Sequence, residues 1–148
     1  MGKIEAINIT NISEENTFYI NQAFLEKGKG IVNDRYYGNF KEKKEQVTLI
    51  NLEEINNFNN QIKLNIDAKD FRRNIIISGI NLNELINKKI KINEVILIIH
   101  EICQPCKYLQ DKLKTPSLVK MLVNKSGVRA EIIKSGSLSV GDTIKIIK

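Results

Sequence analysis

The sequence contains few of the residues that build metal centres. Among its 148 residues there are two cysteines, Cys103 and Cys106, one histidine, His100, and no tryptophan. A structural zinc site needs about four nitrogen or sulfur ligands, usually from two separated pairs. One cysteine pair and one histidine fall short of that number, so a zinc centre of this kind is disfavoured. We expect His100 to be a partly buried side chain bonded to a neighbour.

Long apolar runs are also missing. The run VILII, Val95 to Ile99, is far shorter than the roughly 20 residues that a helix needs to cross a bilayer. The N-terminal stretch MGKIEAINIT has acidic and polar residues where a signal peptide has an apolar segment. These patterns predict a cytoplasmic protein with no membrane partner. In that reducing compartment the two cysteines are expected to be thiols rather than a structural disulfide.

The charge balance is basic, with 23 Lys and Arg residues against 17 Asp and Glu residues and a formal net charge of +6. Lysine, isoleucine and asparagine are all common, which is typical of a compositional bias of the genome. The excess charge therefore has two interpretations: a solvated lysine-rich surface, or attraction to anionic ligands. Nucleic acid is a disfavoured partner, because few aromatic residues interleave with the basic ones and no recognised module is present.

The pattern along the chain predicts a single domain over residues 1–148, since no repeat, low-complexity block or Pro/Gly linker divides it. Strands are expected over 3–9, 46–52 and 94–102, among about five to seven β segments. A long loop is expected over 27–45, a short helix after residue 52, and helix from Cys103 to Val123. The strands are too closely spaced for successive βαβ units. We therefore predict a mainly β, barrel-like, largely antiparallel sheet with a few short peripheral helices.

The stretch HEICQPCKYL carries both cysteines. CQPCK has the form of a thioredoxin-type redox motif, but it begins at residue 103, and the only later proline is Pro116. Ahead of the expected helix, Cys106 would gain from unpaired backbone N–H groups and the helix dipole. Lys107 adds a nearby cation, so a thiolate at Cys106 is chemically reasonable. We expect Cys103 to be buried and inert, and a purely structural role for both cysteines stays open.

Five separated motifs in a fixed order give a more specific signal than the cysteine pair. They are GKGIVNDRYYG, EQVTLINLEEI, FRRNIIISGINLNELINKKIKIN, HEICQPC and SGVRAEIIKSGSLSVGD. With these motifs the sequence resembles the MOSC family, named for the C-terminal domain of molybdenum cofactor sulfurases. The resemblance runs from about Gly28 to Asp142. It implies a mainly β barrel-like fold that binds the molybdenum cofactor (molybdopterin).

The resemblance also implies roles for individual residues. Cys106 matches the family's conserved thiol, which carries sulfur in some members and ligates molybdenum in enzymatic ones. Arg72, with Asn74 beside it, matches an arginine that holds the pterin phosphate region. Arg35 matches another cofactor-contacting arginine, and Thr48 lies in a segment that supplies small polar contacts. The role of Cys103 is left open, because many members have a different residue at its position.

Arginine suits this ligand, because a planar fork of donors matches a phosphate better than a lysine ammonium does. The alternative to a phosphate-binding role is that Arg35 and Arg72 are surface arginines, each paired with a carboxylate. In the DFRRN motif, Asp70 is an alternative partner that would neutralise Arg73 locally. The family pattern further assigns turn positions to two glycines, Gly127 and Gly141.

Two functions stay open at this point. The first is a protein that binds the molybdenum cofactor and carries or transfers cofactor or sulfur through Cys106 to a molybdoenzyme. The second is a molybdenum-dependent oxidoreductase that reduces N-hydroxylated compounds with electrons from a separate electron-transfer protein. No electron-donor or desulfurase module is fused within the sequence, which favours the carrier. The sequence names no substrate, electron donor or oligomeric state.

Overall fold

A computed structural model describes residues 2–10, 17–105, 110–111, 114 and 117–147. Its strands are β1 (Gly2–Ile9), β2 (Phe18–Ile20), β3 (Gln22–Glu26), β4 (Gly30–Ile31), β5 (Val47–Asn51), β6 (Ile75–Ser78), β7 (Lys89–Ile92), β8 (Val95–Ile102), β9 (Val128–Lys134), β10 (Gly136–Ser139) and β11 (Thr143–Ile147). Its helices are α1 (Leu52–Ile62) and α3 (Leu118–Met121), with 3-10 turns η1 (Lys43–Glu45), η2 (Ala68–Phe71) and η3 (Leu82–Leu85). No helix in these ranges is long and apolar enough to span a membrane.

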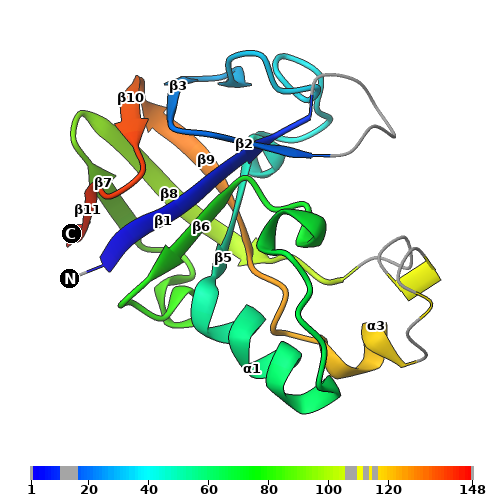
Figure 1. The fold of residues 1–148 in the computed structure, drawn as a ribbon. Coiled ribbons are helices and arrows are strands. Elements are labelled where there is room, and N and C mark those ends of the chain that lie inside the picture. The colour runs from blue at the N-terminus through cyan, green and yellow to red at the C-terminus, as the bar shows by residue number, and fades with distance from the viewer. Residues whose placement is uncertain (1, 11–16, 106–109, 112–113, 115–116, 148) are drawn as a thin grey trace.

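Seven strands form a closed barrel in the order β11-β7-β8-β9-β5-β6-β1. The barrel closes where β1 pairs with β11, with Gly2 opposite Ile144. Strand β2 extends the sheet beyond β1, while β3, β4 and β10 form a separate small sheet above it (Figure 1). The pair β5–β6 is parallel and the chain crosses between these strands through α1, whereas the neighbouring pairs are antiparallel. The prediction of a mainly β, barrel-like fold is confirmed.

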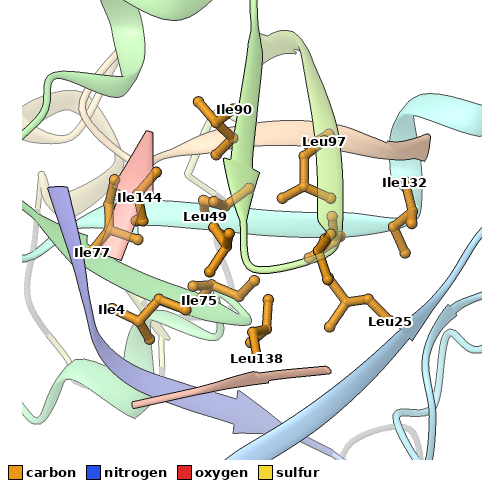
Figure 2. Close-up of a cluster of buried hydrophobic side chains, with 14 of the residues drawn as sticks. Ile4, Leu25, Leu49, Ile75, Ile77, Ile90, Leu97, Ile132, Leu138 and Ile144 are labelled. Carbon is orange, nitrogen blue, oxygen red and sulfur yellow. The ribbon is translucent and has the colours of Figure 1, made fainter. Parts of the chain in front are cut away.

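The barrel interior is filled by aliphatic side chains from almost every strand (Figure 2). Leu49 of β5 and Ile75 and Ile77 of β6 are fully buried there. Because side chains alternate across a strand, their neighbours Ile50 and Ile76 point outward, yet they are buried as well. Each such side chain stabilises the fold by about 1.5–3 kcal/mol. Burial on both faces explains why these strands read as continuous apolar runs.

The outward-facing residues pack against the helices. Ile55 and Phe58 of α1 join Leu118 and Leu122, at and after α3, in a second apolar cluster on Ile76. In Figure 1 the two helices accordingly lie together on one side of the barrel. The cavity described below lies beside the 3-10 turns η1 and η2, since Glu45 and Arg72 line it.

The structure differs from the sequence prediction in two segments. The predicted loop over 27–45 contains β4 and η1, and its Gly30 adopts a φ of +117° that admits glycine with little strain. The helix predicted from Cys103 is wrong at its start, because 103–105 is not helical. The Cys103 N–H donates to the carbonyl oxygen of Gly127 (2.8 Å), so it is paired across to another segment instead. The predicted helix at residue 52 is confirmed as α1.

Candidate functional site

A cavity of about 680 Å³ lies against the outer face of the barrel wall, where Asn8, Thr48 and Arg129 alternate with residues of the barrel core. The last residues of β1 and the segment after β8 meet there with the first residues of β5 and β9 and with the segment just before β6. The segment 34–41, from the long loop, forms another wall. Arg35, Thr48, Arg72 and Asn74, four residues that the sequence singled out, all line this cavity. Cys106, the fifth, lies outside the described residues.

Positive charge dominates the cavity wall. Among the described lining residues five are cationic and two are carboxylates, a formal excess of three positive charges. The cations are Arg35, Lys41, Arg72, Arg73 and Arg129, and the carboxylates are Asp34 and Glu45. A concave wall with one dominant sign of charge concentrates its field on the enclosed space. The arrangement favours an anionic ligand.

Thr48 and Asn74 are locked to each other at the floor of the cavity. The backbone N–H and the hydroxyl of Thr48 both donate to Asn74 Oδ1, at 3.1 Å each. The Asn74 N–H donates back to Thr48 Oγ1 (2.9 Å), and Asn74 Nδ2 donates to the carbonyl oxygen of Asn8 (3.3 Å). These bonds tie β5, β6 and β1 together just where β6 begins, so the pair shapes the floor.

Arg35 lies at the mouth of the cavity. Its backbone N–H donates to the carbonyl oxygen of Thr10 (2.6 Å) at the end of β1. Its guanidinium lies over the exposed ring of Tyr36, 4.4 Å from the centroid, and Nη2 donates to the Tyr36 hydroxyl (2.7 Å). Asp34 Oδ1 in turn accepts the Thr10 N–H (3.0 Å), and burial raises the pKa of this carboxyl above 3.8. Asp34 therefore fixes the loop that presents Arg35.

Arg72 caps the turn η2 in a left-handed conformation, with a φ of +59°. Its N–H donates to the carbonyl oxygen of Lys69 (3.0 Å), and Thr17 Oγ1 donates to that same oxygen (2.6 Å). A non-glycine residue in this region carries backbone strain, and such residues gather at functional sites. The turn holds Arg72 on the β1 side of the cavity, beside Asn8, whose Nδ2 donates to the carbonyl oxygen of Arg73 (3.0 Å).

The side chain of Arg73, unlike that of its neighbour Arg72, is bonded to two other segments of the chain. Its Nε donates to the carbonyl oxygen of Ser126 (2.7 Å), and Nη2 donates to Ser126 Oγ (3.0 Å) and to the carbonyl oxygen of Gln104 (3.1 Å). Ser126 and Gln104 are the partners that the structure gives the Arg73 guanidinium, and the alternative in which Asp70 neutralises Arg73 stays a prediction. Arg73 clamps the segment that leads to Cys106 against the turn before β9.

The cysteine segment is docked by further bonds. Gln104 exchanges two hydrogen bonds with Asn124: Nε2 donates to Asn124 Oδ1 (2.7 Å) and Oε1 accepts the Asn124 N–H (2.9 Å). Cys103 is only 3% exposed, as predicted, but it also lines the cavity. Gly127 has a φ of +96°, so its predicted turn role is confirmed. Within the described ranges, no group of three or more His, Cys, Asp or Glu residues could hold a metal ion.

Two cavity residues that the sequence did not single out carry the most unusual chemistry. Asn8 is 1% exposed, and its Oδ1 has no hydrogen-bond partner within the part of the chain that the structure describes. Arg129 Nε is also buried with no hydrogen-bond partner among the described residues. The carboxylates of Glu45 and Glu101 lie 3.6 and 3.8 Å from the guanidinium, beyond hydrogen-bonding distance. In the sequence, each of them is only a polar residue near one end of an apolar strand. Many strand ends at a protein surface share that pattern, so it could not single these two out.

The prediction that His100 is partly buried and bonded to a neighbour is confirmed. His100 on β8 is partly buried, and its Nε2 lies 2.9 Å from Glu131 Oε1 on β9. Near the cavity rim, Lys44 bonds Glu101 (2.7 Å) and Glu42 (3.1 Å), and its bond to Glu101 holds the pKa of that carboxyl below its usual range. These exposed pairs order the rim and add little stability.

A model of the MOSC domain matches residues 34–145, which is most of the chain and includes the cavity wall from Asp34 to Arg129. This protein belongs to the MOSC domain family. The family is one associated with the molybdenum cofactor. No curated protein sequence matches the chain at a significant level.

Solved structures show that this MOSC chain has the same fold as other proteins. YuaD from Bacillus subtilis aligns with a TM-score of 0.86 at 19% sequence identity, over 99% of this chain and 96% of that one. YiiM from Geobacillus stearothermophilus aligns with a TM-score of 0.80 at 15% identity, over 100% of this chain and 76% of that one. YiiM from Escherichia coli gives 0.75 at 12% identity, over 99% and 70%. At these identities the likeness concerns the fold.

Proposed function

We propose that this protein binds the molybdenum cofactor in the cavity that Arg35 and Arg72 line and carries or transfers cofactor or sulfur through Cys106. The observation that carries the proposal is the strongly cationic cavity of a MOSC-family chain, to which Arg35 and Arg72 come from separate segments. The partner that receives the cargo would be a molybdoenzyme. The chain's own residues would bind, orient and shield the cofactor.

The donor set fits the parts of this cofactor. Its phosphate calls for charge-assisted hydrogen bonds, and the cavity has a formal excess of three positive charges. Its pterin is flat and rich in N–H donors and ring acceptors, and polar residues such as Thr10, Asn39 and Gln104 line the same cavity. When bound, the cofactor supplies a metal centre able to exchange oxygen, sulfur and electrons.

Arg35 and Arg72 would hold the phosphate. Both lie on the β1 side of the cavity, Arg35 through its bond to Thr10 and Arg72 through the turn η2. Two guanidinium forks that approach from separate loops can bind different oxygens of one phosphate. The left-handed backbone of Arg72 ends the turn η2 with a hydrogen bond to Lys69, and this cap fixes the point from which the Arg72 side chain extends.

Cys106 would supply the sulfur chemistry. It follows Gln104 by two positions, and Gln104 is a cavity-lining residue clamped by Arg73. Two residues of chain span at most about 7 Å, so a thiol directed into the cavity is compatible with the placement of Gln104. A soft thiolate suits both uses, as a ligand for molybdenum and as an acceptor of a persulfide sulfur.

The test is the pterin content of protein purified from a host that makes the cofactor. We expect close to one pterin per chain, and a sharp loss in Arg35→Gln and in Arg72→Gln with the fold intact by circular dichroism. Lys145→Gln is the matched control, because it removes one cation from β11, away from the cavity. Full retention of pterin in both arginine variants would show that the phosphate assignment is wrong.

A second assay separates carrier from enzyme. Cofactor-loaded protein is mixed with an N-hydroxylated purine and a surrogate electron donor, and formation of the reduced base is followed. We expect no turnover with full cofactor loading, together with transfer of the cofactor to an apo-molybdoenzyme. Sustained turnover would make the protein a molybdenum-dependent reductase instead, with an electron-transfer protein as its partner.

A further inference from the structure

The turn η2, which ends at Arg72, is tied to the segment of strand β2 by two side chains. Thr17, directly before β2, is 8% exposed, and its Oγ1 donates to the carbonyl oxygen of Lys69 (2.6 Å). The same oxygen accepts the Arg72 N–H (3.0 Å), the bond that caps the left-handed end of η2. The Thr17 hydroxyl therefore bonds the backbone group on which the placement of Arg72 depends.

Tyr19 of β2 holds the beginning of the same turn. Its hydroxyl donates to Asp67 Oδ1 and accepts the Lys69 N–H (3.1 Å). Partial burial and the bond to Asp67 raise the pKa of Tyr19 to about 12, so the hydroxyl keeps its proton at neutral pH. The same bond lowers the pKa of the Asp67 carboxyl, so the acceptor is an ionised carboxylate. Charge-assisted bonds of this kind are stronger than neutral ones.

Strand β2 relates this turn to the wall of the cavity. It pairs with β1, with Tyr19 opposite Asn8, and both Asn8 and Thr17 line the cavity. The backbone of Arg35 is bonded to the residue that follows the same strand β1. Both arginines are therefore fixed relative to β1, Arg35 directly and Arg72 through β2 and η2.

The turn has a second anchor of a different kind. Phe71 is 4% exposed in the apolar cluster, and its ring meets that of Phe58 edge to face, with the centroids 5.9 Å apart. Apolar burial is non-directional, whereas hydrogen bonds depend on angle. Phe71 thus keeps η2 on the barrel, and the bonds from Thr17 and Tyr19 set its direction. Loss of either hydroxyl should leave the turn attached but less well aligned.

We propose that Thr17 and Tyr19 are positioning residues that set the selectivity of the cavity for a phosphate-bearing ligand, because they align η2 so that Arg72 reaches the phosphate. Thr17 has the larger effect, since its hydroxyl bonds the oxygen that caps the turn at Arg72. Tyr19 has the smaller effect, because Asp67 Oδ1 is a second acceptor for the Lys69 N–H (3.3 Å). This inference rests on the proposed function, in which Arg72 binds the phosphate.

The experiment compares the affinities of two probes, 6-hydroxymethylpterin and its phosphate ester. The chain has no tryptophan, so pterin fluorescence is read without indole emission. Thr17→Val should weaken the ester by about fivefold, the loss expected for one hydrogen bond, and leave the plain pterin unchanged. Tyr19→Phe should weaken the ester by about threefold. Thr17→Ser keeps the hydroxyl and should keep the wild-type preference for the ester.

A double-mutant cycle tests whether Thr17 acts through Arg72. Arg72→Gln alone should abolish most of the preference for the ester, and Thr17→Val added to it should have no further effect. Thr143→Val is the matched control, because it removes a threonine hydroxyl from β11, away from the cavity. It should bind both probes as the wild type does.

Three results would overturn the inference and leave the proposed function standing. They are additive losses in the double variant, equal weakening of both probes in Thr17→Val, and a wild-type preference for the ester in Thr17→Val. A wild-type preference in Arg72→Gln would remove the phosphate assignment on which the inference rests. Failure of the wild-type protein to bind either probe would overturn the proposed function together with the inference.

Discussion

Neighbouring residues of the same strands build two unlike regions. Ile75 is fully buried in the barrel core, whereas Asn74, the residue before it, lies in the cavity floor. The same contrast separates Leu49 from Thr48 on β5. The core is apolar, and its contacts serve stability. The cavity is cationic, and two buried polar atoms of its residues have no hydrogen-bond partner among the described residues, which are properties that cost stability.

Truncation in the core should have the largest effect on stability and none on recognition. Ile75→Ala removes a side chain that is 0% exposed, so we expect the free energy of unfolding to fall by about 2–5 kcal/mol in urea titrations. The pterin content per folded molecule should match that of the wild type. A stable variant that binds no pterin would break the division between core and cavity.

Gly127→Ala should damage both regions. A Cβ at this position meets the Leu49 carbonyl group at a φ of +96°, and the Gly127 carbonyl oxygen holds Cys103. We expect a loss of stability larger than the roughly 1–3 kcal/mol of backbone strain alone, and lower cofactor content.

Gly141→Ala is the control for that variant. Its φ is +95°, but nothing lies within 4 Å of a Cβ there, so it reports the strain without the clash. Comparing the thermal unfolding of the two variants separates the effect of backbone strain from the effect of the clash with Leu49. Equal losses would mean that the contact with Leu49 is unimportant.

Arg73→Lys should loosen the cysteine segment while it keeps the charge. A lysine cannot reproduce the three bonds to Ser126 and Gln104, so we expect a loss of about 1–2 kcal/mol. Buried Cys103 should then be alkylated faster by iodoacetamide, as peptide mass spectrometry would show. An unchanged rate at Cys103 would mean that the clamp does not hold the segment.

Asp34→Asn should have the smallest effect, visible in the pH dependence. Because burial raises the pKa of Asp34 above 3.8, the folded wild type binds more protons than the unfolded chain in the window just above that value. Its stability relative to Asp34→Asn should therefore rise as the pH falls through that window. A constant difference in melting temperature between pH 7 and pH 4 would contradict this assignment.

The sequence predicted the parts of this molecule that depend on local pattern or on motif order. Helix α1, the strand pattern and the turn glycine Gly127 follow from periodicity and family motifs. Arg73 and Gln104 could not be assigned, because their roles depend on contacts across 31 positions of the chain. The helix expected from Cys103 fails for a similar reason, since a long-range bond to Gly127 overrides local helical pattern at 103–105.

The same limit applies to the cavity. Arg35 and Arg72 were identified by motif, but their gathering in one cavity with Arg129 and Asn8 comes from strand order. Nothing in the linear sequence distinguishes Asn8 from any other asparagine near a strand end. The unpartnered atoms that set it and Arg129 apart appear only after β1, β5, β6 and β9 are placed side by side.

The most direct test compares molybdenum and pterin in wild type, Cys106→Ser and Cys103→Ser, each purified from a cofactor-producing host. If one thiolate meets the metal at the edge of this arginine-lined cavity, Cys106→Ser retains pterin and loses most of its molybdenum, while Cys103→Ser keeps both. Equal molybdenum in all three proteins would contradict the account.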